Sequence, residues 1–201
     1  MASTIQVDTI KDIGGNTIIS SNGSGTFTSN LPASAPNVSI ATGTLPIANG
    51  GTGAATFAAA GLSNTPAFHA SGGANGTVAN STDVIVANDD ELFDSDGRYN
   101  TSTYRFTPGV AGKYYLYASA RWQTGTNAAT RLDIAILKNG SSVLGARNNN
   151  SDYSTVNVSG IVDLDADDYV EERSSQNTGN PVAVSEEANL TFFGGFRIIG
   201  A

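Results

Sequence analysis

The sequence predicts an all-β protein with an extended N-terminal arm, and three observations lead to this prediction. Turn-forming residues are frequent, with 23 glycines and 6 prolines in the chain. Charged residues make up only 14% of it, and the second part contains short runs of alternating polar and apolar residues. Many short strands joined by turns are typical of a sandwich or a barrel. A length of 201 residues suffices for one such domain and an appendage.

Composition excludes several function classes. The chain has no cysteine and one histidine, which excludes disulfides and thiol nucleophiles and disfavours a catalytic metal centre. The net charge of -8 disfavours nucleic acid, whose binding needs clustered Lys and Arg. The N-terminal residues lack the basic and apolar regions of a signal peptide, and no apolar run is long enough to span a bilayer. We therefore expect no nucleic-acid partner and no membrane insertion.

Charge divides the chain near residue 65. Residues 1–65 contain only three charged side chains, which are Asp8, Lys11 and Asp12. Their apolar residues stand singly among Gly, Ser, Thr and Asn and cannot enclose a core. Thr4–Ile10 alternates as an edge-pairing strand does. We expect residues 1–30 to be an arm that becomes ordered on a partner or on sister subunits; a disordered leader is the alternative.

The next segment, residues 31–65, contains the run GTLPIANGGTG at Gly43–Gly53. Its glycines favour tight turns, and the Ala-rich residues Ala54–Leu62 favour a very short helix. The segment resembles a pattern that recurs in bacteriophage tail-fibre proteins, and the N-terminal leader is similar to the opening of structural proteins from marine phages. The resemblance implies a fibre-type shaft or joint over residues 31–65. Because residues 1–30 cannot form a core of their own, we expect this virion-docking arm to add strands to a virion partner or to sister subunits, with Ile5, Val7 and Ile10 as anchors.

Residues 66–201 carry the strand patterns. Lys113–Trp122 alternates and places five apolar residues on one face, which are Tyr114, Leu116, Ala118, Ala120 and Trp122. Arg131–Lys138 also alternates and ends at Asn139-Gly140, a strong hairpin signal. Thr155–Leu164 has valines on one parity, and Leu190–Ile199 is apolar on both, which suits a strand buried on two faces.

Five motifs in this part resemble, in order, the globular head of complement component 1q. They are Pro66–Ala70 (PAFHA), Tyr99-Asn100, Tyr104–Pro108 (YRFTP), Ala111–Tyr117 (AGKYYLY) and Thr191–Phe196 (TFFGGF). The resemblance implies a ten-stranded antiparallel jelly-roll sandwich of the tumour-necrosis-factor type over residues 66–201, assembled as a homotrimer. The chain departs from that family in two respects: it has no collagen stalk, and an extra glycine interrupts the last motif.

Aromatic residues outside the expected core suggest where the subunits meet. Tyr115 and Tyr117 lie on the strand face opposite the core, and Phe193 lies on the second apolar face of the last strand. Aromatic side chains are enriched in subunit interfaces. We predict that Tyr115, Tyr117 and Phe193 lie at the trimer interface.

The sequence contains few candidates for catalysis or metal binding. His69 is the only imidazole, and a structural or surface role is expected because no nucleophile has a second base. Asp94–Gly97 has the carboxylate density of a calcium loop but lacks the closing Glu of an EF-hand. Calcium binding is the alternative to a solvated turn. Asp163–Asp168 is expected to be a solvated face, with a glycosidase-like carboxylate pair as the alternative. We expect no enzyme, no catalytic residue, no metal and no cofactor.

The connections between strands differ in length, and antiparallel strands place successive connections at alternate ends of the sandwich. The short ones are Pro108–Gly112, Asn139-Gly140 and Asp165–Asp168. The long ones, rich in Asn, Ser, Thr and Gly, are Gln123–Thr130, Arg147–Ser154 and Gln176–Ala188. We expect the long loops at the end opposite the incoming arm.

Adaptable amides and hydroxyls beside aromatic residues on a rigid scaffold suit receptor binding. The predicted receptor-binding residues are Trp122, Gln123, Thr126, Asn127, Arg147, Asn148, Asn149, Asn150, Tyr153, Asn177 and Asn180. The functional hypothesis is a virion protein: a trimeric tail fibre or spike that docks through its N-terminus and recognises a host surface glycan or protein through the long loops. The alternatives are a capsid-decoration or tail-joining trimer without a receptor, and a secreted carbohydrate-binding module.

Overall fold

The computed structural model describes residues 8–21, 27–29, 54, 59–60, 63–72, 75–124, 131–149 and 154–199. The chain divides into two compact units, Met1–Ala60 and Gly61–Ala201. The described residues form strands and turns without a helix, so the all-β prediction is confirmed for them. No helix in this part of the chain could cross a membrane. The glycine-rich motif at Gly43–Gly53 and most of the predicted short helix lie outside the described residues.

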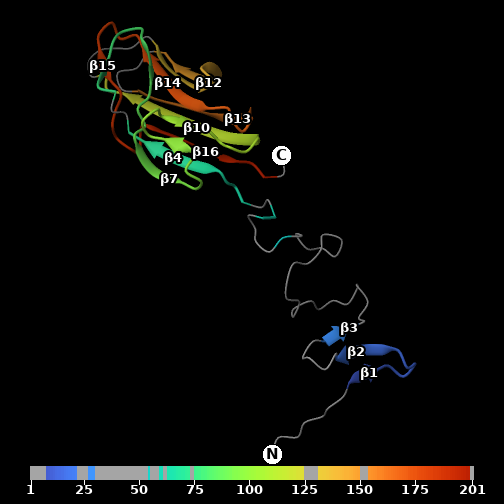
Figure 1. Ribbon diagram of the computed structural model, residues 1–201. Helices are drawn as coiled ribbons and strands as arrows, with labels where there is room; N and C mark the ends of the chain where they lie inside the picture. Colours follow the sequence, from blue (N-terminus) through green and yellow to red (C-terminus); the bar gives the residue numbers. More distant parts are fainter. Residues whose placement is uncertain are drawn as a thin grey trace, which may run out of the picture. The chain divides into compact units, whose positions relative to one another are not determined.

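The first unit contains a small antiparallel sheet of β1 (Thr9–Lys11), β2 (Thr17–Ser21) and β3 (Phe27–Ser29) (Figure 1). The turn between β1 and β2 is closed by Asp12, whose carboxylate accepts hydrogen bonds from the backbone and side chain of Asn16 at 2.8 and 2.9 Å. These bonds lower the pKa of Asp12. Gly15 takes the positive φ of 81° that the turn requires. These strands thus pair with one another within one chain, whereas the sequence analysis expects residues 1–30 to pair with a partner or with sister subunits.

The second unit is a sandwich of two antiparallel sheets (Figure 1). The five-stranded sheet has the order β13 (Ser154–Leu164), β10 (Gly112–Trp122), β16 (Phe192–Arg197), β4 (Ala67–Ser71) and β7 (Asp90–Asp94). The six-stranded sheet contains β12 (Ser141–Asn148), β11 (Leu132–Lys138), β14 (Val170–Gln176), β9 (Arg105–Phe106) and β8 (Tyr99–Asn100), and β6 (Asp83–Ile85) also pairs with β14. A separate pair joins β5 (Thr77–Val78) to β15 (Val182–Ala183).

The described strands of this unit, β4 to β16, outnumber the ten expected from the resemblance. The difference arises from pieces of two or three residues such as β5, β6 and β15. Such pieces are too short to show the alternation by which a strand is found in a sequence.

The core lies between the two large sheets. Residues Tyr114 to Trp122 of β10 bury the five alternate side chains that the sequence places on its core face, each at most 2% exposed. Phe68 of β4 stacks on Phe106 of β9 at 4.3 Å between ring centroids, and Phe193 of β16 meets Phe68 edge-on at 5.0 Å. Burying these rings removes apolar area from water, the main stabilising contribution in a domain of this size.

Strand register shows which connections share an end of the sandwich. Trp122 pairs with Ser154, and Leu132 pairs with both Asn148 and Gln176. All three long loops therefore leave from one end, here called the distal end, as predicted.

At the other end, here called the proximal end, Gly112 pairs with Leu164, Lys138 pairs with Ser141 and Val170, and Ala67 pairs with Phe196. The chain thus enters β4 at the proximal end. The prediction that the long loops lie opposite this entry point is confirmed.

The two glycines of the last motif each accommodate a side chain of β10. Gly194 lies opposite Tyr117 on the outer face, and Gly195 lies opposite Leu116 on the core face. A Cβ atom on Gly194 would lie 2.4 Å from the Tyr117 ring, and one on Gly195 would lie 2.6 Å from Leu116. Position 194 must therefore be a glycine, because the ring of Tyr117 occupies the space that a side chain would need.

Candidate recognition surface at the distal end

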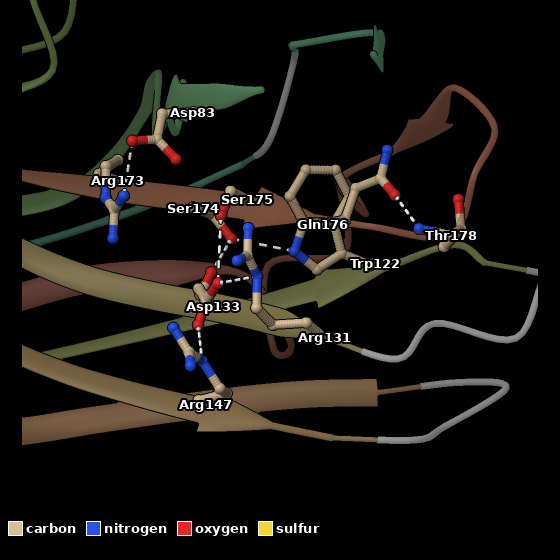
Figure 2. A network of polar contacts seen from close by, with 10 residues as sticks. All are labelled: Asp83, Trp122, Arg131, Asp133, Arg147, Arg173, Ser174, Ser175, Gln176 and Thr178. Atoms are coloured by element: carbon tan, nitrogen blue, oxygen red, sulfur yellow. Dashed lines mark hydrogen bonds and ion pairs between the residues drawn. The ribbon is translucent and has the colours of Figure 1, made fainter. Parts of the chain in front are cut away.

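The distal end contains a cluster of three charged side chains that the sequence analysis missed. Asp133 of β11 lies between Arg131, which precedes the strand, and Arg147 of β12 (Figure 2). Arg147 Nε donates to Asp133 Oδ1 at 2.5 Å, and Arg131 Nε forms an ion pair with Oδ2 at 2.7 Å. Ser175, the partner of Asp133 on β14, donates to Oδ2 at 3.4 Å. We call Arg131, Asp133 and Arg147 the arginine clasp.

A chain of hydrogen bonds joins the clasp to the core (Figure 2). The indole Nε1 of Trp122 donates to Ser174 Oγ at 2.9 Å, and Ser174 Oγ donates to the backbone carbonyl of Asp133 at 2.8 Å. The backbone N–H of Asn177 donates to the carbonyl of Arg131 at 3.1 Å. The backbone that carries the clasp is thus bonded to β14 and the turn after it, and to β10 through Ser174.

Trp122 cannot bind a receptor in this structure, so that prediction is wrong. Its side chain is 0% exposed and lies in the core with Val156 and Val184. The last residue of a strand still follows the alternation of that strand, so Trp122 faces inward with Ala120 despite standing beside a loop.

The other predicted receptor-binding residues fall into three groups. Arg147 belongs to the clasp, and its side chain is 57% exposed. Gln123, Asn149 and Asn180 are exposed at the distal end, and Asn148 and Asn177 are half-buried. Thr126, Asn127, Asn150 and Tyr153 lie outside the described residues. The structure thus brings several of these amide side chains to the distal end. Their contact with a receptor stays a prediction.

The turn after β14 is held by a buried amide. Gln176 is 0% exposed and its Nε2 donates to the carbonyls of Val78 and Asn180 at 3.2 and 3.0 Å. Its Oε1 accepts the backbone N–H of Thr178 at 2.7 Å (Figure 2). The buried Gln176 side chain forms hydrogen bonds with the backbone of both Thr178 and Asn180. The backbone at Asn180 is therefore held in one position.

The outer face of the five-stranded sheet carries a cluster of rings, which we call the aromatic face. Its members are His69, Phe93, Tyr115, Tyr117, Phe192 and Phe196. Neighbouring ring centroids lie between 5.6 and 6.3 Å apart. Phe93 is 51% exposed and Ile161, on the adjoining strand β13, is 60% exposed. A continuous apolar surface of this kind is typical of an interaction site.

Tyr115 and Tyr117 lie on the aromatic face, whereas Phe193 does not. Phe193 is 0% exposed and pairs with Ala118, so the prediction that it lies at a subunit interface is wrong. The alternation of β16 turns Phe192 and Phe196 outward in its place. His69 Nδ1 lies 3.0 Å from the Tyr117 hydroxyl, and partial burial lowers the pKa of the imidazole. These contacts give His69 a structural role on this face.

The acidic residues that the sequence analysis considered for calcium binding, at Asp94–Gly97, or for a carboxylate pair, at Asp163–Asp168, form other contacts. The Asp94 carboxylate accepts the backbone N–H of Asp96 at 3.2 Å and that of Tyr99 at 2.6 Å. Asp163 pairs with Lys113 at 2.6 Å, and Asp168 pairs with Lys138 at 2.7 Å. Across the described residues, no group of three or more His, Cys, Asp or Glu side chains is placed to hold a metal ion. The residues that the structure describes therefore do not form a set of ligands for calcium.

Comparison with known proteins identifies the domain type. The C1q domain family matches residues 67–198. The globular domain of zebrafish complement 1qA protein is 25% identical with a TM-score of 0.49, over 67% of this chain and 98% of that chain. A crystal structure of murine APRIL gives a TM-score of 0.53 at 13% identity, over 66% of this chain and 98% of that chain, which shows a shared fold. A search among curated proteins gave no match.

Proposed function

The chain belongs to the C1q domain family through residues 67–198, and from this premise we propose that it is a non-enzymatic, homotrimeric recognition protein. In its specific form the proposal is a bacteriophage tail fibre or spike. The first unit docks on the virion, and the distal end of the second unit binds a glycan or protein on the host surface.

The observation that carries the proposal is the separation of the two ends of the sandwich. The chain enters through Ala67 at the proximal end, and the clasp and the exposed amides lie at the distal end. A protein that is anchored through its N-terminus can therefore present the distal end away from its anchor. Loops on a rigid scaffold are the usual location of binding residues.

The aromatic face supports self-association. It spans four strands of one sheet and leaves Phe93 and Ile161 more than half exposed. Aromatic residues in the centre and polar residues at the rim characterise stable subunit interfaces. Burial of this face between three copies leaves the opposite sheet, with the clasp, facing outward.

The docking role rests on the tail-fibre resemblance of residues 43–62 and on exposed apolar residues of the first unit. Ile10 on β1 is 46% exposed, and Ile13 in the following turn is fully exposed. Such residues on a small sheet suit insertion against a partner surface. Ile5 and Val7, the other predicted anchors, lie outside the described residues.

Competition for adsorption tests the proposal. Purified trimeric protein is added to host cells before the phage particles, and the rate of adsorption is measured. We expect the rate to fall as the protein occupies its receptor. If adsorption is unchanged, while particles that lack the protein lose physical stability, the protein is a structural trimer without a receptor and the proposal is wrong.

A further inference from the structure

The arginine clasp has an excess of positive charge that distinguishes it from the other ion pairs. Each of the other described pairs joins one cation to one carboxylate, such as Lys113 with Asp163 or Arg173 with Asp83. In the clasp one carboxylate, Asp133, serves both Arg131 and Arg147. One positive charge therefore remains uncompensated locally, on a chain whose net charge is -8.

The geometry of the clasp leaves donors available to a ligand. Both arginines contact Asp133 through Nε, and in the part of the chain that the structure describes their terminal guanidinium nitrogens have no other partner. The side chain of Asp133 is 10% exposed, whereas those of Arg131 and Arg147 are 38% and 57% exposed. The largely buried carboxylate thus holds two arginine side chains that are each partly exposed to solvent. The planar fork of donors on each group matches a carboxylate.

A shallow hollow of about 280 Å³ adjoins the clasp on the outer face of the six-stranded sheet. Its lining includes the small residues Ala135 and Gly145, together with Ser142, Arg173 and the clasp residues Asp133 and Arg147. This volume is smaller than the roughly 300–1,000 Å³ of pockets for drug-sized ligands. It suits one ring of a longer chain, whose hydroxyl groups can pair with Ser142.

We propose that the arginine clasp binds the carboxylate group of an acidic saccharide, with one uronic acid ring seated in the hollow over Ala135 and Gly145. This inference rests on the proposed function and names the ligand class of its distal site. The ion pairs with Asp133 hold the arginines in place before the ligand arrives. Less conformational entropy is then lost on binding than with free surface arginines.

Binding of defined oligosaccharides to the full-length protein tests this inference. The probes are alginate oligomers, which consist of uronic acids, neutral malto-oligomers of the same length, and dextran sulfate. We expect binding to alginate oligomers alone at physiological salt, with an affinity that falls as salt is added. Equal binding to dextran sulfate and alginate would reduce the interaction to non-specific charge and overturn the inference.

The matched variants are Arg147→Gln in the clasp and Lys113→Gln at the proximal end, which change the net charge equally. We expect Arg147→Gln to weaken alginate binding by about tenfold or more, because hydrogen bonds to a charged group are lost. Lys113→Gln should bind as the wild type does, and Arg147→Lys, which keeps the charge without the fork, should recover only part of the affinity. Equal affinities of Arg147→Gln and the wild type would overturn the inference.

The adsorption assay separates this inference from the proposed function. If the wild-type protein blocks adsorption but alginate neither binds nor competes, the receptor is not an acidic saccharide and the proposed function stands. If the protein blocks no adsorption but binds alginate through Arg147, the clasp is a saccharide site and the receptor role is wrong.

Discussion

The ring of Tyr117 lies directly over the backbone of Gly194, its partner across β10 and β16. A Cβ atom at position 194 would lie 2.4 Å from the Tyr117 Cζ and hydroxyl oxygen. With no side chain beneath it, the ring stays close to the sheet and its hydroxyl reaches His69 Nδ1 at 3.0 Å. The conformation of the aromatic face thus depends on a residue that contributes no side chain to it.

The change Gly194→Ala should therefore destabilise the second unit. The added methyl group forces Tyr117 to move, and overpacking of this kind costs about 1–3 kcal/mol. Urea denaturation measures the free energy of unfolding. The control is Gly145→Ala on β12, whose Cβ atom would meet its nearest neighbour at an ordinary 3.5 Å. Equal stabilities of the two variants would show that Tyr117 moves aside without cost.

Burial of the only tryptophan gives a second prediction, which needs no substitution. Trp122 is 0% exposed and its indole donates to Ser174. We expect blue-shifted fluorescence with little quenching by acrylamide, and no change when a ligand binds at the distal end. Emission typical of a solvated indole would contradict the placement of Trp122 in the core.

The difference between prediction and structure at Trp122 and Phe193 has one physical origin. The alternation of β10 correctly predicts its core face, including Trp122. The position of Trp122 beside a loop nevertheless favours an exposed side chain, and the alternation of the strand overrides this signal. In β16 both parities are apolar, so the sequence alone cannot tell which face meets the core. The register with β10 determines the face: Phe193 pairs with Ala118, which faces the core, and Gly194 pairs with Tyr117, which faces outward.

The clasp could not be predicted, because it depends on a bulge. The turn at Asn139-Gly140 pairs Lys138 with Ser141, and an undisturbed register would place Asp133 opposite Ala146. An irregularity between Ile136 and Leu137 shifts the register by one residue and brings Asp133 opposite Arg147. In the sequence Asp133 appears only as a polar residue within an alternating strand. By contrast, the distal position of the long loops follows from strand alternation alone.

Asp168 predicts an acid-sensitive contribution to stability. Lys138, the backbone N–H of Asp165 and Asn139 all donate to its carboxylate and lower its pKa from 3.8 to about 2. Because the folded-state pKa is depressed, this stabilisation is present above about pH 4 and is lost as the pH falls toward 2. Asp168→Asn should lower the free energy of unfolding at pH 7 by about 1–2 kcal/mol. It should also flatten the pH dependence in that range.

The control for Asp168 is Asp163→Asn, which removes the same charge from an exposed pair with Lys113. We expect a change within about 0.5 kcal/mol for this variant. The comparison uses denaturant unfolding at several pH values. If both variants lose a similar free energy of unfolding, net charge and not the hydrogen bonds of Asp168 determines the fall in stability at low pH.

Glu172 predicts the opposite pH dependence. Its side chain is 0% exposed, and burial raises the pKa of the carboxyl well above its usual value although Asn88 donates to it at 2.7 Å. Because the folded state holds the proton more tightly, stability is greatest below the unfolded pKa and falls as the pH rises through the folded pKa. Glu172→Gln cannot ionise and should gain stability relative to the wild type as the pH increases. A constant difference between pH 4 and pH 8 would contradict this account.

The aromatic face is the basis of the trimer in this account. The double variant Phe93→Asp and Ile161→Asp changes two residues that are 51% and 60% exposed, so each protomer should keep its fold and its circular dichroism spectrum. Charges on this surface should prevent association, because a buried unpaired carboxylate is costly.

The most direct test of the central claim is the mass of residues 61–201, which form a compact unit with its own core, measured by light scattering at micromolar concentration. The account predicts three times the protomer mass for the wild type and the protomer mass for the double variant. A wild-type fragment with the mass of one protomer, or a double variant that remains trimeric, would contradict it.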